Sequence, residues 1–233
     1  VIRANARHFM GDCAGELEEA RAGIAQHGPN NLRMYEARAL ACLGETDAVL
    51  EVVESELDRK LVQPGPPRAA EMAVAELEAH GHGGASDRVS RRVLDWYETA
   101  PRAMKDDRSS VYIHGRVLFF AGRLDEAREV FQESVALHSR LGSSGHVARL
   151  FLAHIAIRQG RRDDAMRLYD WFEETNPPSI WGGQFAAMLG DNERAVELLS
   201  SGVGRSLGGL HQQASLASLR DYPPFQELIR PIG

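Results

Sequence analysis

The sequence predicts an all-α fold: an α-solenoid of about six helix hairpins with a C-terminal capping helix segment. The first observation is a composition rich in alanine and leucine, with aromatic residues at only 7%, which favours helices over strands. The second is a motif in which a glycine is followed five residues later by alanine, with acidic residues between them. Full copies begin at Gly15, Gly122, Gly160 and Gly190, and weaker copies begin at Gly44 and Gly84. Recurrence at this spacing is typical of helical repeats.

Each motif predicts a turn between two helices. Glycine can end a helix in the left-handed conformation, and acidic residues stabilise the start of the next helix. A small residue also recurs seven positions before four of the turn glycines, where the two helices of a hairpin need to approach closely. These small residues are Ala37, Gly115, Ala153 and Gly183.

Proline and glycine clusters separate the predicted hairpins, at residues 63–67, 141–145 and 176–178. The glycines at 202, 204 and 208 miss the dinucleotide-binding spacing and predict a flexible linker. We therefore expect a repeat array over residues 1–209 and a capping segment over 210–233, with no separate globular domain.

The repeats resemble the tetratricopeptide family, whose helix pair carries a small residue, a turn glycine, an alanine and an aromatic in this order. Gly115, Gly122, Ala127 and Phe131 follow that order, and the next unit repeats it. The resemblance implies a non-catalytic scaffold that binds a protein or peptide partner in a concave groove.

The end of the chain carries a second resemblance. Leu219, Arg220, Pro223, Phe225 and Leu228 follow a pattern similar to the closing segment of tetratricopeptide regions in bacterial signalling proteins. There the repeats follow a kinase, a nucleotide cyclase or a DNA-binding domain. Because the chain starts without methionine, the alternative function is a C-terminal regulatory or dimerising arm of such a protein, with a homodimer as one arrangement.

Charge and hydropathy exclude several classes of partner. With 27 basic and 33 acidic residues, the net charge of −6 offers no general attraction to nucleic acid. No apolar run is long enough to span a membrane, and the first residues lack the layout of a signal peptide. We expect a cytoplasmic protein without a membrane or nucleic-acid partner.

The sequence contains no nucleophile elbow and no phosphate-binding loop, so we expect neither catalytic residues nor a cofactor. His80 and His82, beside Asp87, are the best metal candidates, but they lie in a glycine-rich turn and predict an exposed loop without metal. Paired acids such as Asp163 and Asp164 predict helix caps. Aromatic pairs predict core packing; these are Trp96 with Tyr97 and Trp171 with Phe172.

Cys13 and Cys42 occupy equivalent positions two residues before their assigned turn glycines. Equivalent helices of adjacent repeats lie about 8–10 Å apart, which exceeds the Cα separation of a disulfide. The sequence therefore predicts two free thiols.

The resemblance also indicates which first-helix positions line the groove. We expect a mixed apolar and basic lining that holds a segment with apolar anchors and negative charge. The alternative is that the arginines of this set only pair with acids on neighbouring helices. The candidate groove residues are Arg38, Tyr112, Arg116, Phe119, His154, Ile157 and Gln184.

Overall fold

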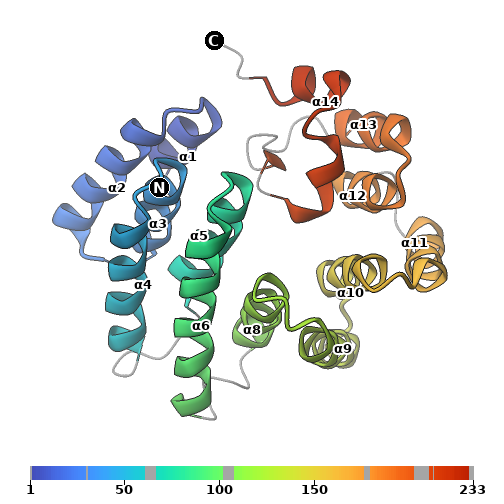
Figure 1. Cartoon of the computed structure of the whole chain (residues 1–233), viewed down its shortest axis with the longest axis horizontal. Helices are drawn as coiled ribbons and strands as arrows, with labels where there is room; N and C mark the ends of the chain where they lie inside the picture. The colour runs from blue at the N-terminus through green and yellow to red at the C-terminus, as the bar shows by residue number, and fades with distance from the viewer. Residues whose placement is uncertain are drawn as a thin grey trace. The chain divides into compact units, whose positions relative to one another are not determined.

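The computed structural model describes residues 2–29, 31–60, 67–101, 108–175, 179–201, 210–211 and 213–230. Consecutive helices follow one another along the chain (Figure 1), and these residues include no β-strand. The predicted class, an all-α fold of repeated helix hairpins, is confirmed. None of the described helices combines the length and the hydropathy needed to cross a membrane.

The chain forms two compact units, one up to Arg123 and one from Leu124 to Arg230. In unit 1, α3 packs against both α2 and α5, and α5 packs in turn against α6 and α8. Alanine, valine and leucine side chains fill the spaces between these helices. The helices of unit 1 are α1 (Ile2–Phe9), α2 (Cys13–His27), α3 (Leu32–Cys42), α4 (Thr46–Lys60), α5 (Arg68–Ala79), α6 (Gly83–Thr99) and α8 (Arg108–Phe120).

In unit 2, α10 packs against α9, α11 and α12, and the closing segment packs on α12 and α13. Leu216, Leu219 and Phe225 of that segment are buried in one cluster with Ala195 and Leu199 of α13. The elements of unit 2 are α9 (Leu124–Arg140), α10 (His146–Arg158), α11 (Arg162–Thr175), α12 (Ile180–Leu189), α13 (Asn192–Ser201), the 3-10 helix η2 (Ala214–Leu219) and α14 (Pro223–Leu228).

The observed turn glycines are the predicted ones in four hairpins and different ones in two. Gly44, Gly122, Gly160 and Gly190 follow a first helix and have positive φ, as predicted. The assignment of Gly15 and Gly84 was wrong, because both lie inside second helices. Gly11 and Gly81 make those two turns, with φ of +70° and +79°.

The first helix pair shows why the motif was misplaced. The side chain of Asp12 caps α2 by accepting a hydrogen bond from the Gly15 amide at 2.8 Å, so Gly15 belongs to the first turn of that helix. A Cβ on Gly15 would lie only 2.3 Å from a carboxylate oxygen of Asp12, which explains the glycine without a turn. Five residues after the true turn glycine stands Glu16, at the position that alanine occupies after Gly122, Gly160 and Gly190. The motif therefore matched Gly15 and Ala20 instead.

The small residues predicted at the helix crossings are buried where the helices meet. Ala37 and Ala153 are fully buried. A Cβ on Gly183 would lie 2.7 Å from Leu199 Cγ and 3.0 Å from the carbonyl oxygen of Ala195, so α12 and α13 approach at that point. The crossing depends on the absence of a side chain there.

The predicted breaks fall partly inside the described chain. Residues 141–145 separate α9 from α10 as expected. Residues 63–66, 176–178 and the linker at 202–209 lie outside the described residues.

Candidate functional site

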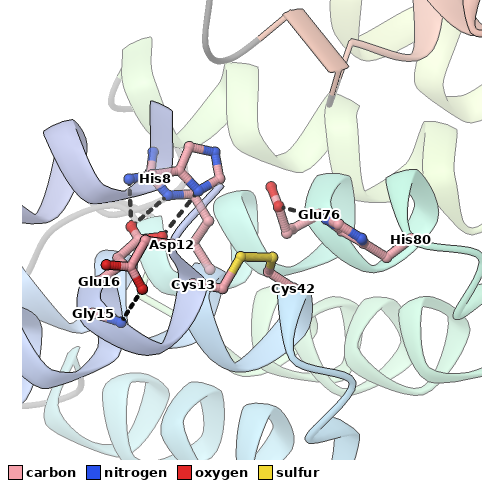
Figure 2. The surroundings of a disulfide bond; sticks show 9 residues. His8, Asp12, Cys13, Gly15, Glu16, Cys42, Glu76 and His80 are labelled. Atoms are coloured by element: carbon pink, nitrogen blue, oxygen red, sulfur yellow. Dashed lines mark hydrogen bonds and ion pairs between the residues drawn. A yellow bond between two sulfur atoms is a disulfide. The ribbon is translucent and has the colours of Figure 1, made fainter. Parts of the chain in front are cut away.

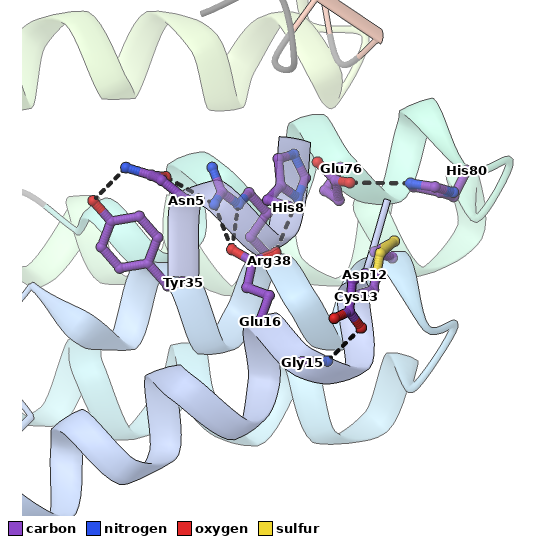
Figure 3. A network of polar contacts seen from close by, with 11 residues as sticks. Asn5, His8, Asp12, Cys13, Gly15, Glu16, Tyr35, Arg38, Glu76 and His80 are labelled. Atoms are coloured by element: carbon purple, nitrogen blue, oxygen red, sulfur yellow. Dashed lines mark hydrogen bonds and ion pairs between the residues drawn. A yellow bond between two sulfur atoms is a disulfide. The ribbon is translucent and has the colours of Figure 1, made fainter. Parts of the chain in front are cut away.

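Arg38, the first predicted groove residue, lies in a buried polar network of unit 1 (Figure 3). Its Nε donates to Glu16 Oε1 at 2.8 Å, and its Nη2 donates to Asn5 Oδ1 at 3.0 Å. The other carboxylate oxygen of Glu16 lies 2.9 Å from His8 Nδ1. The guanidinium carbon stands 5.2 Å from the centre of the Tyr35 ring. With 5% of its surface exposed, Arg38 is engaged by its neighbours, as in the pairing alternative.

The three predicted residues on α8 are also mostly covered within unit 1. Arg116 forms an ion pair with Glu71 of α5, and its guanidinium carbon lies 5.7 Å from the centre of the Tyr112 ring. Burial raises the pKa of Tyr112 to about 12, partly offset by Arg116. Phe119 is buried in the core. These side chains pack and pair inside the unit.

The remaining predicted residues lie in unit 2, on the side that the closing segment covers. Gln184 is buried and accepts a hydrogen bond from the Ser215 hydroxyl of η2 at 2.6 Å. His154 and Ile157 line a cavity of about 310 Å³ whose other walls include Ala214 and Ser215. Burial, with a smaller effect from Arg158, lowers the pKa of His154 to about 4, so the imidazole is neutral at neutral pH.

A second cavity of unit 2, of about 400 Å³, has a different lining. It lies among α9, α10 and α11, and we call it the arginine cleft. Four arginines and one aspartate contribute charged groups, so the formal charge of the lining is 4 − 1 = +3. Its residues are Arg128, Gln132, Arg149, Leu152, Ala156, Arg161, Asp164, Arg167, Leu168 and Trp171.

Arg149 and Trp171 form the aromatic part of the arginine cleft. The guanidinium carbon of Arg149 lies 4.1 Å from the centre of the Trp171 ring, which is a cation–π contact. The Arg149 Nε donates to the carbonyl oxygen of Ser144 at 3.2 Å. Burial lowers the pKa of Arg149, although arginine stays charged at neutral pH. Within the described parts of the chain, no carboxylate lies within 4.0 Å of this guanidinium group.

The other cleft arginines have acidic partners. Arg161 and Arg167 form ion pairs with opposite oxygens of Asp164, each three residues away on the chain. The Nη2 atom of Arg128 lies 3.2 Å from Oδ1 of Asp125, and both residues are on α9. Arg128 and Arg161 are about one third exposed and Arg167 is largely exposed, so solvent reaches all three.

Sequence reasoning missed this cleft because it assigned Trp171 to the core. Trp96, Tyr97 and Phe172 are buried as predicted, whereas Trp171 is only partly buried and lines the cavity. Arg167 and Trp171 are four residues apart and so share a helix face. This spacing could have indicated that an arginine and a tryptophan lie together on α11. Which face of α10 meets them depends on tertiary packing.

The prediction of two free thiols was wrong. Cys13 and Cys42 form a disulfide with a Cα–Cα distance of 6.1 Å (Figure 2). Because Gly11 makes the first turn, Cys13 begins the second helix of its hairpin, while Cys42 ends the first helix of the next one. These two helix ends lie side by side, so the cysteines are not at equivalent positions.

The predicted histidine pair divides between two helix ends. His80 follows α5, and its Nε2 lies 3.0 Å from Glu76 Oε1, whereas His82 precedes α6. Cys42, Glu76 and His80 bring potential ligand atoms within 4.8 Å of one another.

Comparison with known proteins supports the repeat assignment. A tetratricopeptide repeat model matches residues 110–133 and 146–171, which contain most of α8, the first part of α9, all of α10 and most of α11. No curated protein matches the chain. The matched segments contain the residues that line the arginine cleft, and these segments are similar to tetratricopeptide repeats.

Proposed function

We propose that this protein is a non-catalytic scaffold and that the arginine cleft binds an acidic segment of a partner protein. The observation that carries the proposal is the set of four arginines around the partly exposed Trp171. Tetratricopeptide repeats usually serve as protein-interaction scaffolds, so a protein segment is the favoured occupant.

Charge supports an acidic occupant. The cleft carries +3 on a chain whose net charge is −6, so a negative segment is attracted locally and repelled elsewhere. Guanidinium groups match carboxylates in a bidentate geometry, and Arg149 is the cleft arginine without a carboxylate partner among the described residues. A partner carboxylate at Arg149 would therefore form a new ion pair without breaking an existing one.

The apolar part of the lining supports an anchor beside the charges. Leu152, Ala156, Leu168 and Trp171 lie in the same cavity as the arginines. Aromatic side chains and arginine are enriched at the centres of protein interfaces. A segment that combines glutamate or aspartate with leucine or another apolar residue fits both parts of the lining.

The lining itself gives little support to a catalytic role. Arginine does not act as a proton acceptor, because its guanidinium keeps its charge. Each carboxylate oxygen of Asp164 is paired with a guanidinium group, from Arg161 or from Arg167. These groups are suited to holding a negative ligand.

The test uses fluorescein-labelled peptides and the purified full chain. One peptide alternates glutamate with leucine, a second replaces each glutamate with glutamine, and a third replaces it with lysine. We expect the first to bind, with an affinity that falls as salt is raised, and the other two to bind at least about tenfold more weakly. Equal binding of the glutamate and glutamine peptides would contradict the proposal.

Variants locate the site. Arg149→Ala should weaken binding of the glutamate peptide by about tenfold or more, since a charge-assisted contact contributes roughly 1.5–3 kcal/mol. Arg230→Ala is the matched control, because Arg230 is an exposed arginine of unit 2 outside the cleft. If both variants bind as the unmodified chain does, the cleft is not the site.

The same assay separates the cleft from the groove predicted by the sequence. Ile157 lines the cavity of about 310 Å³ beside the closing segment, so Ile157→Ala should leave peptide binding unchanged. Loss of binding in Ile157→Ala with none in Arg149→Ala would favour that groove. Light scattering of the same samples tests the dimerising-arm alternative, for which a dimer is expected.

A further inference from the structure

Three side chains that can bind a metal ion lie close together in unit 1, and a fourth, Cys13, is bonded to one of them (Figure 2). Potential ligand atoms of Cys42, Glu76 and His80 lie within 4.8 Å of one another. Cys13 joins them because its Sγ is bonded to that of Cys42. The cluster therefore offers two sulfurs, one imidazole nitrogen and one carboxylate.

Three helix ends hold these side chains in place. Cys13 is the first residue of α2, and Cys42 is the last residue of α3. Glu76 and His80 are four residues apart at the end of α5, so their side chains share one face. Since α3 packs against both α2 and α5, the cluster lies where rigid elements converge.

The donor set matches the preference of zinc. Structural zinc sites use four ligands drawn from cysteine thiolate, histidine nitrogen and carboxylate oxygen in a tetrahedron. His80 Nε2 and Glu76 Oε1 are already 3.0 Å apart, close to the spacing of two ligands on one ion. With Zn–S bonds of about 2.3 Å, the two sulfurs would stand roughly 3.8 Å apart. The Cα separation of 6.1 Å is compatible with that sulfur spacing.

We propose that the reduced form of this protein binds one Zn²⁺ through Cys13 Sγ, Cys42 Sγ, His80 Nε2 and Glu76 Oε1. Glu76 is fully buried, and a divalent cation beside it stabilises the charged carboxylate. Zn²⁺ ties α2, α3 and α5 together, whereas the disulfide joins only α2 and α3.

Oxidation and metal binding exclude each other at this site. A dithiol reductant transfers two electrons and two protons to the disulfide, which gives two thiols and the oxidised reductant. Binding of Zn²⁺ then releases the two thiol protons. A thiol-oxidising agent removes two electrons from the thiolates, re-forms the S–S bond and expels the ion. The site is thus loaded only under reducing conditions.

The experiment titrates the full chain with Co²⁺ and then with Zn²⁺, after reduction by a dithiol and removal of metal. We expect one Co²⁺ per chain with a thiolate-to-cobalt charge-transfer band, and its displacement by Zn²⁺. The oxidised chain should show no such band. A reduced chain without the band, or equal metal binding by the oxidised chain, would overturn the proposal.

Variants assign the ligands. Cys13→Ser and Cys42→Ser each remove one thiolate, so each should lower the thiolate-to-cobalt charge-transfer band of the reduced chain by roughly half or more. His80→Ala removes a direct ligand of the proposed ion. It should therefore weaken Zn²⁺ binding by more than roughly 10- to 100-fold, which is the usual loss when a residue that only hydrogen-bonds to a metal ligand is altered. His80 is exposed, so its removal should leave the helical circular dichroism unchanged. His82→Ala is the matched control, and an equal loss of affinity in both histidine variants would contradict the assignment.

Discussion

Glu16 and Arg38 form an ion pair that is buried in unit 1, with the carboxylate fully covered and the arginine 5% exposed. Glu16 stands at the repeat position that alanine occupies after Gly122, Gly160 and Gly190. A charge at a helix crossing costs free energy unless partners surround it. Arg38 and His8 supply those partners here.

Removing Arg38 should therefore destabilise the protein. Arg38→Met leaves the Glu16 carboxylate buried without its guanidinium partner, and we expect a loss of about 3–5 kcal/mol in the free energy of unfolding. Urea unfolding followed by circular dichroism measures it. Arg21→Ala is the control, because Arg21 is 57% exposed beside Glu36 and should cost less than about 1 kcal/mol. Similar small losses in both variants would show that the buried pair is not formed.

His154 should make stability depend on pH. The unfolded imidazole binds a proton with its ordinary pKa of 6.5, whereas the folded one does so only at about 4. The unfolded state thus binds more protons between these values, and the free energy of unfolding falls as pH is lowered from 6.5 towards 4. The loss reaches up to about 3 kcal/mol.

Unfolding of His154→Gln over the same pH range tests this prediction. The variant should show a shallower fall in stability than the unmodified chain. Parallel pH profiles for the unmodified chain and His154→Gln would contradict it.

Two glycines test the corrected turn assignment. Gly81 has a φ of +79°, so Gly81→Ala should destabilise the protein by about 1 kcal/mol. Gly84 lies inside α6, and a Cβ added to it would meet nothing within 4 Å, so Gly84→Ala should stabilise the protein by about 0.4–1 kcal/mol. Chemical denaturation of the two variants gives the comparison. If Gly84→Ala were the less stable of the two variants, Gly84 and not Gly81 would be the turn glycine.

A buried alanine tests the helix crossings. Ala165 is buried where α11 packs against α10, and Ala165→Leu should overpack the crossing and cost about 1–3 kcal/mol. Ala136 is exposed on α9, so Ala136→Leu should change stability by less than about 0.5 kcal/mol. Thermal unfolding compares them, and an unaltered midpoint for Ala165→Leu would mean that the crossing is loose.

The fold class could be predicted because each signal was local. Gly122 and Gly160 end helices through their own conformational freedom, and Ala127 and Ala165 are buried at crossings that the repeat pattern implies. The prediction for the first hairpin was wrong because Gly15 lies in the first turn of α2, which Asp12 caps, and the residues from Gly15 to Ala20 still match the turn motif. A one-turn error of this kind moved Cys13 to the wrong helix and hid the disulfide.

The arginine cleft could not be predicted in the same way. Arg149 stands on α10 and Trp171 on α11, and their contact depends on how two helix faces meet. Nothing in the spacing of these residues shows that meeting. Gln184 illustrates the same limit, since its partner Ser215 lies in the closing segment, 31 residues later.

The central claim is that an acidic segment binds at Trp171. The chain has three tryptophans, Trp96, Trp171 and Trp181, and only Trp171 lines the arginine cleft. Nuclear magnetic resonance of the indole N–H groups, assigned with Trp171→Phe, follows all three during titration with the glutamate–leucine peptide. We predict that the Trp171 resonance shifts in a saturable manner while that of Trp96 stays in place. A bound peptide that leaves the Trp171 resonance unmoved would contradict the proposal.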